Sequence, residues 1–255
     1  MEKERIFEAE MLDAATQDAA PLFSEVHQDT SLMTLLNVYC PGMDLRSQTI
    51  KLQHNVGGGG CFPLHFDTDA AVDSRKVTAI FYLNPEWREG DGGELVLYPF
   101  PKERVAVQPL SGRMALFSSP NMLHRVLPSR AARVCFTLWL TARPPLGLPG
   151  AGRPPRRPLG PQLEEVAAGG DPWGVLGDHS YRKHLSKLFY AEEWAQSIKE
   201  SHAESDARQA ALDVLDKERG VILAAFDHPE ALSRLQQAMD AARRGEGPCP
   251  INWMG

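Results

Sequence analysis

The sequence predicts a mainly β fold with helical additions, and three observations support this prediction. Five short runs rich in β-branched and aromatic residues lie before residue 143, each bounded by Gly, Pro, Asn, Asp or Ser, as strands of an all-β sandwich or barrel are. From Arg143 to Pro161, 11 of 19 residues are proline or glycine, a composition typical of an extended linker. After it, apolar residues recur at helical spacing. We therefore expect a β domain over residues 1–142, a linker over 143–170 and a helical region over 171–255.

The β domain is expected to begin with a helix. Residues 4–20 are rich in Ala, Glu, Met and Leu, so we expect a helix that Pro21 stops. Strands are then expected at QTIKLQH, KVTAIFYL, GELVLYPF, RMALF and RVCFTLWLT. The last run alternates, with Val134, Phe136, Leu138 and Leu140 on one face and Arg133, Cys135, Thr137, Trp139 and Thr141 on the other. A barrel that turns such polar residues inward is expected to contain a site.

The region after the linker shows three apolar stripes, each predicting a helix. They are Tyr181, Leu185, Leu188, Phe189, Trp194 and Ile198; then Leu212, Leu215, Ile222 and Phe226; then Leu232, Leu235 and Met239 after a start near Asp227. These stripes must be buried, and the barrel exterior is the nearest surface. We therefore expect the helices to dock on it.

Composition excludes several classes of function. The net charge of −6 gives no general attraction to nucleic acid or to anionic lipid. The apolar runs are short, and VILAAF, residues 221–226, is far below the roughly 20 residues that a membrane span needs. The four cysteines are scattered and the charged N-terminus lacks a secretory h-region, which favours free thiols in a reducing compartment. A cytoplasmic location is therefore expected, with the nucleus not excluded.

The most informative stretch is NVGGGGCFPLHFDTD, residues 55–69. In an extended strand, residues two apart share a face, so His65 and Asp67 can point at one ion. Imidazole and carboxylate suit Fe(II). His124 follows a run of strands that could bring it back across a barrel as a third ligand. Two histidines and one carboxylate occupy one face of an octahedron and leave positions open for a chelating co-substrate and for dioxygen.

Arg133 strengthens this interpretation. It begins the alternating strand on the face predicted to point inward, together with Thr137. A buried guanidinium is costly to leave unpaired and suits bidentate capture of a carboxylate. A co-substrate carboxylate near the metal would satisfy it, and Tyr82 could add a phenol hydrogen bond.

The blocks HFD, TAIFYLNPEW, DGGELVLYP, GRMALFSSPNMLHRVLP and RVCFTLWL together resemble the iron(II)- and 2-oxoglutarate-dependent oxygenases, specifically the prolyl 4-hydroxylase group. The resemblance spans roughly residues 46–142. An Arg at position 133 is more similar to the oxygen-sensing and ribosomal-protein prolyl hydroxylases than to the collagen type, which carries Lys.

The resemblance implies a double-stranded β-helix (jelly-roll) core, the iron ligands His65, Asp67 and His124, and 2-oxoglutarate held by Arg133, Tyr82 and Thr137. At position 55 many relatives carry a Tyr that touches the co-substrate, and Asn55 could still donate a hydrogen bond there. The resemblance also implies dioxygen as co-substrate, ascorbate as a further cofactor, and a prolyl residue in a protein or peptide as the target. Open alternatives are hydroxylation of a small molecule or another side chain, a non-catalytic scaffold of the same fold, and a metal-dependent hydrolase.

Overall fold

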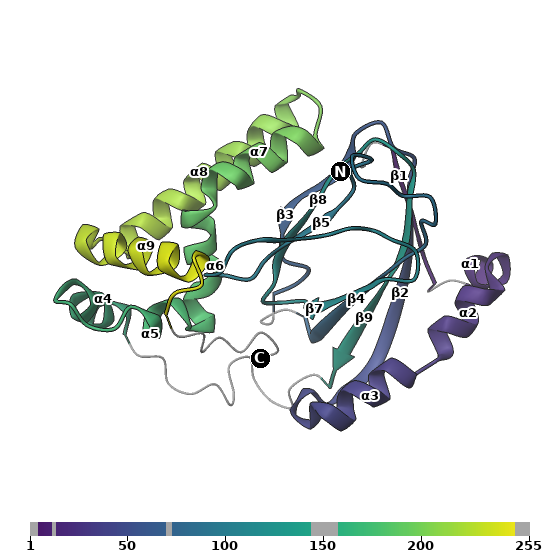
Figure 1. Cartoon of the computed structure of the whole chain (residues 1–255), viewed down its shortest axis with the longest axis horizontal. Helices are drawn as coiled ribbons and strands as arrows, with labels where there is room; N and C mark the ends of the chain where they lie inside the picture. Colours follow the sequence, from purple (N-terminus) through teal and green to yellow (C-terminus); the bar gives the residue numbers. More distant parts are fainter. Residues whose placement is uncertain (1–4, 12–13, 70–72, 144–157, 248–255) are drawn as a thin grey trace.

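The computed structural model describes residues 5–11, 14–69, 73–143 and 158–247. Its centre is formed by two antiparallel sheets that face each other (Figure 1), one in the strand order β1-β2-β9-β4-β7 and the other in the order β3-β8-β5-β6. The strands are β1 (Ile6–Glu10), β2 (Leu45–Asn55), β3 (Gly60–His65), β4 (Arg75–Tyr82), β5 (Leu95–Tyr98), β6 (Val105–Val107), β7 (Met114–Ser118), β8 (Leu123–Ser129) and β9 (Arg133–Ala142). This arrangement confirms the predicted jelly-roll core.

Strand β9 shows how the sequence pattern selects the faces of the larger sheet. It lies between β2 and β4 and pairs with both of them. The even-numbered Phe136 and Leu138 pack outward with Phe23 and Leu32 of the N-terminal helices. The odd-numbered side chains, beginning with Arg133, line a cavity between the two sheets. The alternation predicted for this strand is therefore confirmed.

The expected N-terminal helix over residues 4–20 is confirmed only for Ala14–Ala19 and is wrong for Ile6–Glu10. Residues Ile6–Glu10 form β1, which pairs with β2 along its whole length, from Ile6 opposite Asn55 to Glu10 opposite Lys51. Sheet pairing overrides the helical propensity of this segment. Pro21 does not stop a helix but begins one, because proline lacks only an N–H that the first helical turn leaves unbonded in any case. The helices here are α1 (Ala14–Ala19), α2 (Pro21–Gln28) and α3 (Ser31–Tyr39), followed by the short 3-10 helix Pro41–Met43.

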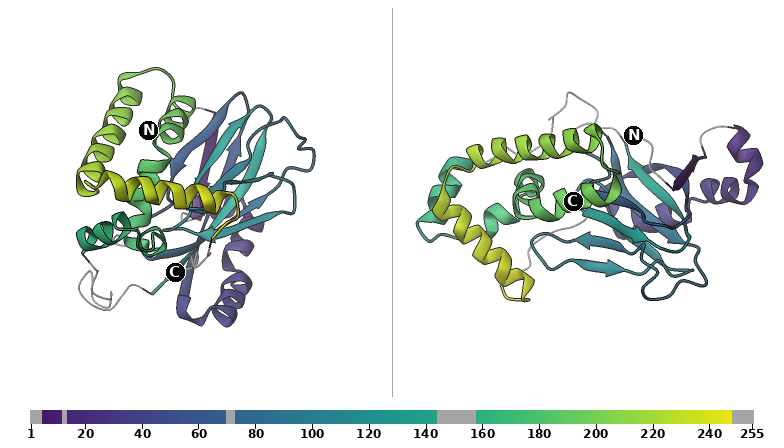
Figure 2. Two further views of the ribbon diagram at one scale, coloured as in Figure 1. Left: turned by 60° about the vertical axis from the view of Figure 1, so that its left-hand side comes forward. Right: turned by 90° about the horizontal axis from the view of Figure 1, so that it is seen from above.

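The C-terminal helices cover the outer face of the smaller sheet, on the side of the barrel opposite the N-terminal helices (Figures 1 and 2). They are α4 (Leu159–Ala167), α5 (Trp173–Leu176), α6 (His179–Phe189), α7 (Ala191–Ser201), α8 (Asp206–Ala225) and α9 (Pro229–Arg243). One buried cluster joins Leu64, Tyr98 and Leu123 of the sheet to Leu185 and Leu235 of the helices. The predicted docking on the barrel exterior is confirmed.

Two details differ from the sequence expectation. The first apolar stripe is divided between α6 and α7, because Tyr190 ends one helix and caps the next. Helix α4 lies inside the range expected as linker, 143–170, and it buries Leu163 and Val166 in the cluster described above. Its Pro161 stands in the first turn, where proline is tolerated. Residues 144–157 lie outside the described part of the chain. Among the described residues, no helix is long and apolar enough to cross a membrane.

Candidate metal centre

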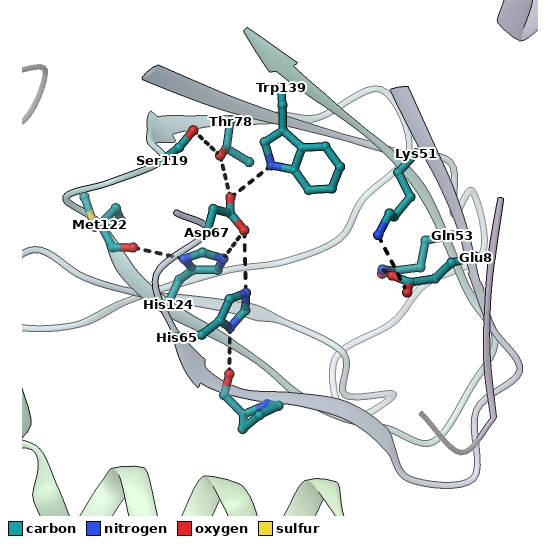
Figure 3. Close-up of polar contacts among 11 residues, drawn as sticks. Glu8, Lys51, Gln53, His65, Asp67, Thr78, Ser119, Met122, His124 and Trp139 are labelled. Carbon is teal, nitrogen blue, oxygen red and sulfur yellow. Dashed lines mark hydrogen bonds and ion pairs between the residues drawn. The ribbon is translucent and has the colours of Figure 1, made fainter. Parts of the chain in front are cut away.

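Three side chains that could hold a metal ion meet where β3 and β8 lie side by side. His65 is the last residue of β3, and the register places it directly opposite His124 of β8. Asp67 follows two residues after His65. One carboxylate oxygen, Oδ1 of Asp67, lies 3.6 Å from Nε2 of His65 and 3.7 Å from Nε2 of His124. Figure 3 shows the three groups turned toward one point, and their ligand atoms all lie within 4.8 Å of one another.

Backbone carbonyls set the orientation of both imidazole rings. Nδ1 of His65 lies 2.8 Å from the carbonyl oxygen of Pro63, and Nδ1 of His124 lies 3.0 Å from that of Met122. A ring that donates its Nδ1 proton to a carbonyl leaves Nε2 unprotonated, which is the form that binds a metal. Both Nε2 atoms therefore point their lone pairs at the same centre.

The Asp67 carboxylate is oriented by two donors on its other oxygen. Oδ2 accepts hydrogen bonds from the Thr78 hydroxyl and, at 3.2 Å, from the indole Nε1 of Trp139. The Thr78 hydroxyl lies in turn 2.8 Å from that of Ser119. These contacts leave Oδ1 for a metal. The sequence placed Trp139 on the inner face of β9 but did not predict this contact, nor the part played by Thr78 and Ser119.

Burial and charge put the centre in the protonation state that a metal needs. Burial alone would raise the pKa of the Asp67 carboxyl, but His124, His65 and the Thr78 hydrogen bond outweigh it and hold that pKa well below its usual value. Burial, with His65 nearby, lowers the pKa of His124 to about 4. At neutral pH the carboxylate is thus ionised and His124 is neutral.

The centre opens into a cavity of about 220 Å³ between the sheets, and Arg133 lies in its wall. The Arg133 side chain is 1% exposed and donates from Nε to the carbonyl oxygen of Gly93 at 2.9 Å and from Nη1 to Oε1 of Gln53 at 3.1 Å. Nη2 takes part in neither bond. Arg133 forms no ion pair with any described residue. A buried, permanently charged group of this kind calls for an anionic ligand.

Tyr82 lies against Arg133, with the guanidinium carbon 5.2 Å from the ring centre. Its hydroxyl is buried and has no hydrogen-bond partner among the described residues. Burial raises the pKa of Tyr82 to about 12, so the hydroxyl keeps its proton and can donate it to an acceptor in a hydrogen bond. Thr137, the third residue expected at the co-substrate, is buried and lines the same cavity.

Asn55 is not among the residues that line the cavity. It is fully buried at the end of β2, where its amide nitrogen donates to the carbonyl oxygen of Gly60 at 2.7 Å and its oxygen accepts from the amide of Gly57 at 3.0 Å. Gly57 has φ +88°, and a Cβ there would lie 2.5 Å from the carbonyl oxygen of Arg130, so only glycine fits this turn. The structure therefore places Asn55 in the β2–β3 turn and not at the expected co-substrate contact.

A charged group that the sequence did not indicate lies across the cavity from the metal ligands (Figure 3). The Lys51 ammonium lies 3.8 Å from the Glu8 carboxylate and 3.3 Å from that of Glu10, and the Gln53 amide donates to Glu8 at 3.1 Å. This network depends on the pairing of β1 with β2. It could not be predicted while residues 4–20 were taken for a helix.

Comparison with known proteins agrees with this geometry. Residues 50–141 match the family model of the 2OG-Fe(II) oxygenase superfamily. A solved structure of a prolyl 4-hydroxylase from Phytophthora capsici is 33% identical, with an alignment that covers 89% of this chain and 78% of that chain at a TM-score of 0.67. The chain belongs to the 2OG-Fe(II) oxygenase superfamily.

Two curated relatives match shorter parts of the chain. Prolyl hydroxylase EGLN3 of Mus musculus is 34% identical over 118 residues, which are 43% of this chain and 48% of the relative. Egl nine homolog 1 of Rattus norvegicus is 35% identical over 86 residues, which are 32% of this chain and 25% of the relative. The match thus spans about half the length of the first relative and about a quarter of the second.

The residues present fit the two groups that the superfamily uses, iron(II) and 2-oxoglutarate. Two imidazoles and a carboxylate are a ligand set for non-haem iron that leaves further coordination positions open. A dicarboxylate would provide a counter-charge for Arg133 and an acceptor for the orphaned hydroxyl of Tyr82. Both groups would bind to polar or charged side chains whose burial without a partner costs free energy.

Proposed function

We propose that the chain is an iron(II)- and 2-oxoglutarate-dependent dioxygenase that hydroxylates prolyl residues in a protein substrate. The observation that carries the proposal is the convergence of His65, Asp67 and His124 at a cavity that is also lined by Arg133. Among the described residues, none forms an ion pair with Arg133. The names of the similar proteins, prolyl 4-hydroxylase and prolyl hydroxylase, support the choice of proline.

In this proposal His65, Asp67 and His124 hold the iron. Arg133 binds one carboxylate of 2-oxoglutarate, with hydrogen bonds from the hydroxyls of Tyr82 and Thr137. Iron(II) held there would activate dioxygen, which is the oxidant: one oxygen atom would enter succinate as 2-oxoglutarate loses carbon dioxide, and the other would be inserted into a C–H bond of the substrate.

The protein's own residues bind and orient. Thr78 and Trp139 fix the Asp67 carboxylate so that one oxygen faces the metal, which keeps the ligand geometry constant through turnover. Two cations lie over the Trp139 ring: the Lys51 ammonium is 5.4 Å and the Arg75 guanidinium 5.2 Å from its centre. Such cation–π contacts stabilise the ring orientation on which the Asp67 hydrogen bond depends.

The proposal also assigns different roles to the β domain and to the C-terminal helices. Every side chain named for the chemistry lies within residues 1–142, and the region 171–255 serves as an accessory helical unit. Ascorbate as a further cofactor and the cytoplasmic location stay predictions.

Mass spectrometry of cellular peptides tests the proposal. Cells that express the parent protein are compared with cells that express Asp67→Ala, and peptides are searched for one added oxygen on proline. A peptide modified only by the parent must then be hydroxylated in vitro by purified protein with iron(II), yielding one succinate per oxygen added. Added oxygen only on other side chains would refute the choice of proline, and absence of succinate with any peptide would refute the dioxygenase.

A further inference from the structure

A second, larger cavity lies beside the metal centre, between the segment that carries its ligands and the C-terminal helices. It has a volume of about 700 Å³ and is formed by residues 65–69 on one side and by α6, α7 and α8 on the other. We call it the helix-side groove. His65 lines both this groove and the cavity that contains Arg133. A ligand that lies in the groove is therefore in contact with His65, one of the three residues of the metal centre.

The floor of the groove is apolar. Phe66, next to the first metal ligand, lies with its ring centre 6.4 Å from that of Trp194 on α7. Val221 of α8 also lines the groove and is 65% exposed, while the neighbouring Ile222 is buried in the core below. An exposed apolar side chain beside two aromatic rings is a contact surface for apolar side chains of a partner.

The rim of the groove carries one lysine that has no ion-pair partner in the part of the chain that the structure describes. Lys183 pairs with Asp69 at 3.3 Å, and Lys187 pairs with Glu218 at 2.5 Å. Lys217 lines the groove from the exposed side of α8 and forms no ion pair with any described residue. Three lysines and two carboxylates thus face the groove, a local excess of positive charge on a chain whose net charge is −6.

Lys217 and Val221 act together because they are four residues apart on one helix and so share a face. A ligand complementary to this face carries an acidic group and, next to it, an apolar side chain. An extended peptide meets both requirements, and it is long enough to continue past His65 to the metal.

We propose that the helix-side groove binds the stretch of the protein substrate that flanks the target residue, and that it selects an acidic residue at Lys217 next to an apolar residue at Val221 and Trp194. This inference rests on the proposed function for the identity of the ligand as a protein substrate. It assigns the C-terminal helices the role of choosing the substrate, while the barrel performs the chemistry.

Fluorescence anisotropy with labelled peptides tests the inference. The peptides share one central proline, and at each flanking position in turn they carry Glu, Ala or Lys. Binding is measured to the full chain with 2-oxoglutarate and with Mn²⁺ in place of iron, so that no turnover occurs. We expect one flanking position at which the Glu peptide binds about fivefold more tightly than the Lys peptide, the effect of a single exposed charge pair.

A charge exchange provides the decisive comparison. Lys217→Glu should reverse the preference at that position, so that the Lys peptide becomes the tighter ligand, whereas Lys199→Glu on the exposed side of α7 should leave it unchanged. Both side chains are exposed, so neither substitution threatens the fold. Val221→Ser should weaken binding of peptides with an apolar neighbour, and Leu223→Ser, at an exposed position on another face of α8 outside the groove, should not.

Several outcomes overturn the inference. An unchanged charge preference in Lys217→Glu, or equal binding of all peptides, shows that the groove does not choose the substrate. A Lys217→Glu variant that alters the oligomeric state in sedimentation and leaves peptide affinity unchanged shows instead that the face binds a second copy of the chain. Succinate production by the parent protein is recorded separately: its absence refutes the proposed function, while the anisotropy data still decide whether the groove binds peptides.

Discussion

Replacement of Arg133 by methionine separates a binding role from a structural one. The change removes the guanidinium and keeps a long apolar side chain of similar reach. In the protein without 2-oxoglutarate it deletes three hydrogen bonds, to Gly93, Gln53 and the Cys135 sulfur, each contributing about 1 kcal/mol or less. It also removes a charge that is buried without a counter-ion, which favours the variant. We expect these effects to offset each other, so the free energy of unfolding should change by less than about 1 kcal/mol.

Binding of 2-oxoglutarate should change much more. Loss of a buried charge pair typically costs 2–5 kcal/mol, and about 3 kcal/mol corresponds to a dissociation constant raised about 150-fold. At a 2-oxoglutarate concentration of about 100 times the parent's dissociation constant, the ligand stabilises the parent by about 2.7 kcal/mol, whereas the variant gains about 0.3 kcal/mol. For a chain of this size, the melting temperature should rise by about 5–10 °C in the parent and by about 1 °C in the variant.

Thermal unfolding with Mn²⁺, with and without 2-oxoglutarate, measures both quantities. Arg133→Lys should fall between the two, because an ammonium keeps the charge and loses the planar fork. Arg130→Met, at an exposed position, is the matched control and should behave as the parent does. The reasoning is refuted if Arg133→Met melts far below the parent without ligand and yet keeps the full rise with 2-oxoglutarate, since Arg133 would then be structural only.

Three further predictions concern the metal centre and the division of the chain. Trp139→Phe removes one of the two donors to Asp67 and should weaken iron binding about tenfold, measured by competition with a chelator, while Thr78→Ser, which keeps its hydroxyl, should not; equal affinities in parent and Trp139→Phe would contradict the role given to the indole. Burial lowers the pKa of His124 to about 4 in the folded protein, whereas the unfolded chain takes up the proton near pH 6.5. The free energy of unfolding of the metal-free protein should therefore fall by up to about 3 kcal/mol as the pH is lowered from about 6.5 to about 4. Denaturant titrations over this pH range measure the loss, and His124→Gln should not show it. A chain cut at residue 143 keeps every named catalytic side chain but exposes the outer face of β3-β8-β5-β6, so it should show low solubility together with detectable succinate formation; a fragment folded by circular dichroism that makes no succinate would contradict the proposed division.

The sequence predicted the parts of the site that depend on local spacing. His65 and Asp67 are two residues apart at the end of a strand, so their convergence follows from the geometry of an extended chain. The inward face of β9 followed from its alternation, which correctly placed Arg133 and Thr137 in one cavity. The register of β3 against β8, which sets His124 opposite His65, is a long-range pairing, and the family resemblance supplied it.

The parts that were missed depend on tertiary contacts. The β1 segment has helix-forming residues, and only its pairing with β2 makes it a strand; as a result, the Glu8–Lys51 network could not be foreseen. The family resemblance suggested that Asn55 contacts the co-substrate, but its side-chain amide is hydrogen-bonded to Gly57 and Gly60 in the β2–β3 turn. Residue spacing alone could not predict these hydrogen bonds. The helix-side groove is formed by segments that lie far apart in the sequence, so no single motif could indicate it.

Conversion of 2-oxoglutarate to succinate by the iron-loaded protein tests the central claim most directly. The parent should produce succinate slowly without substrate. His65→Ala, Asp67→Ala and His124→Ala should each abolish production, because a three-ligand centre loses its chelation when any member is removed. Circular dichroism should show that the fold of each variant persists. Full succinate production by any one of the three folded variants would contradict the assignment of the metal centre.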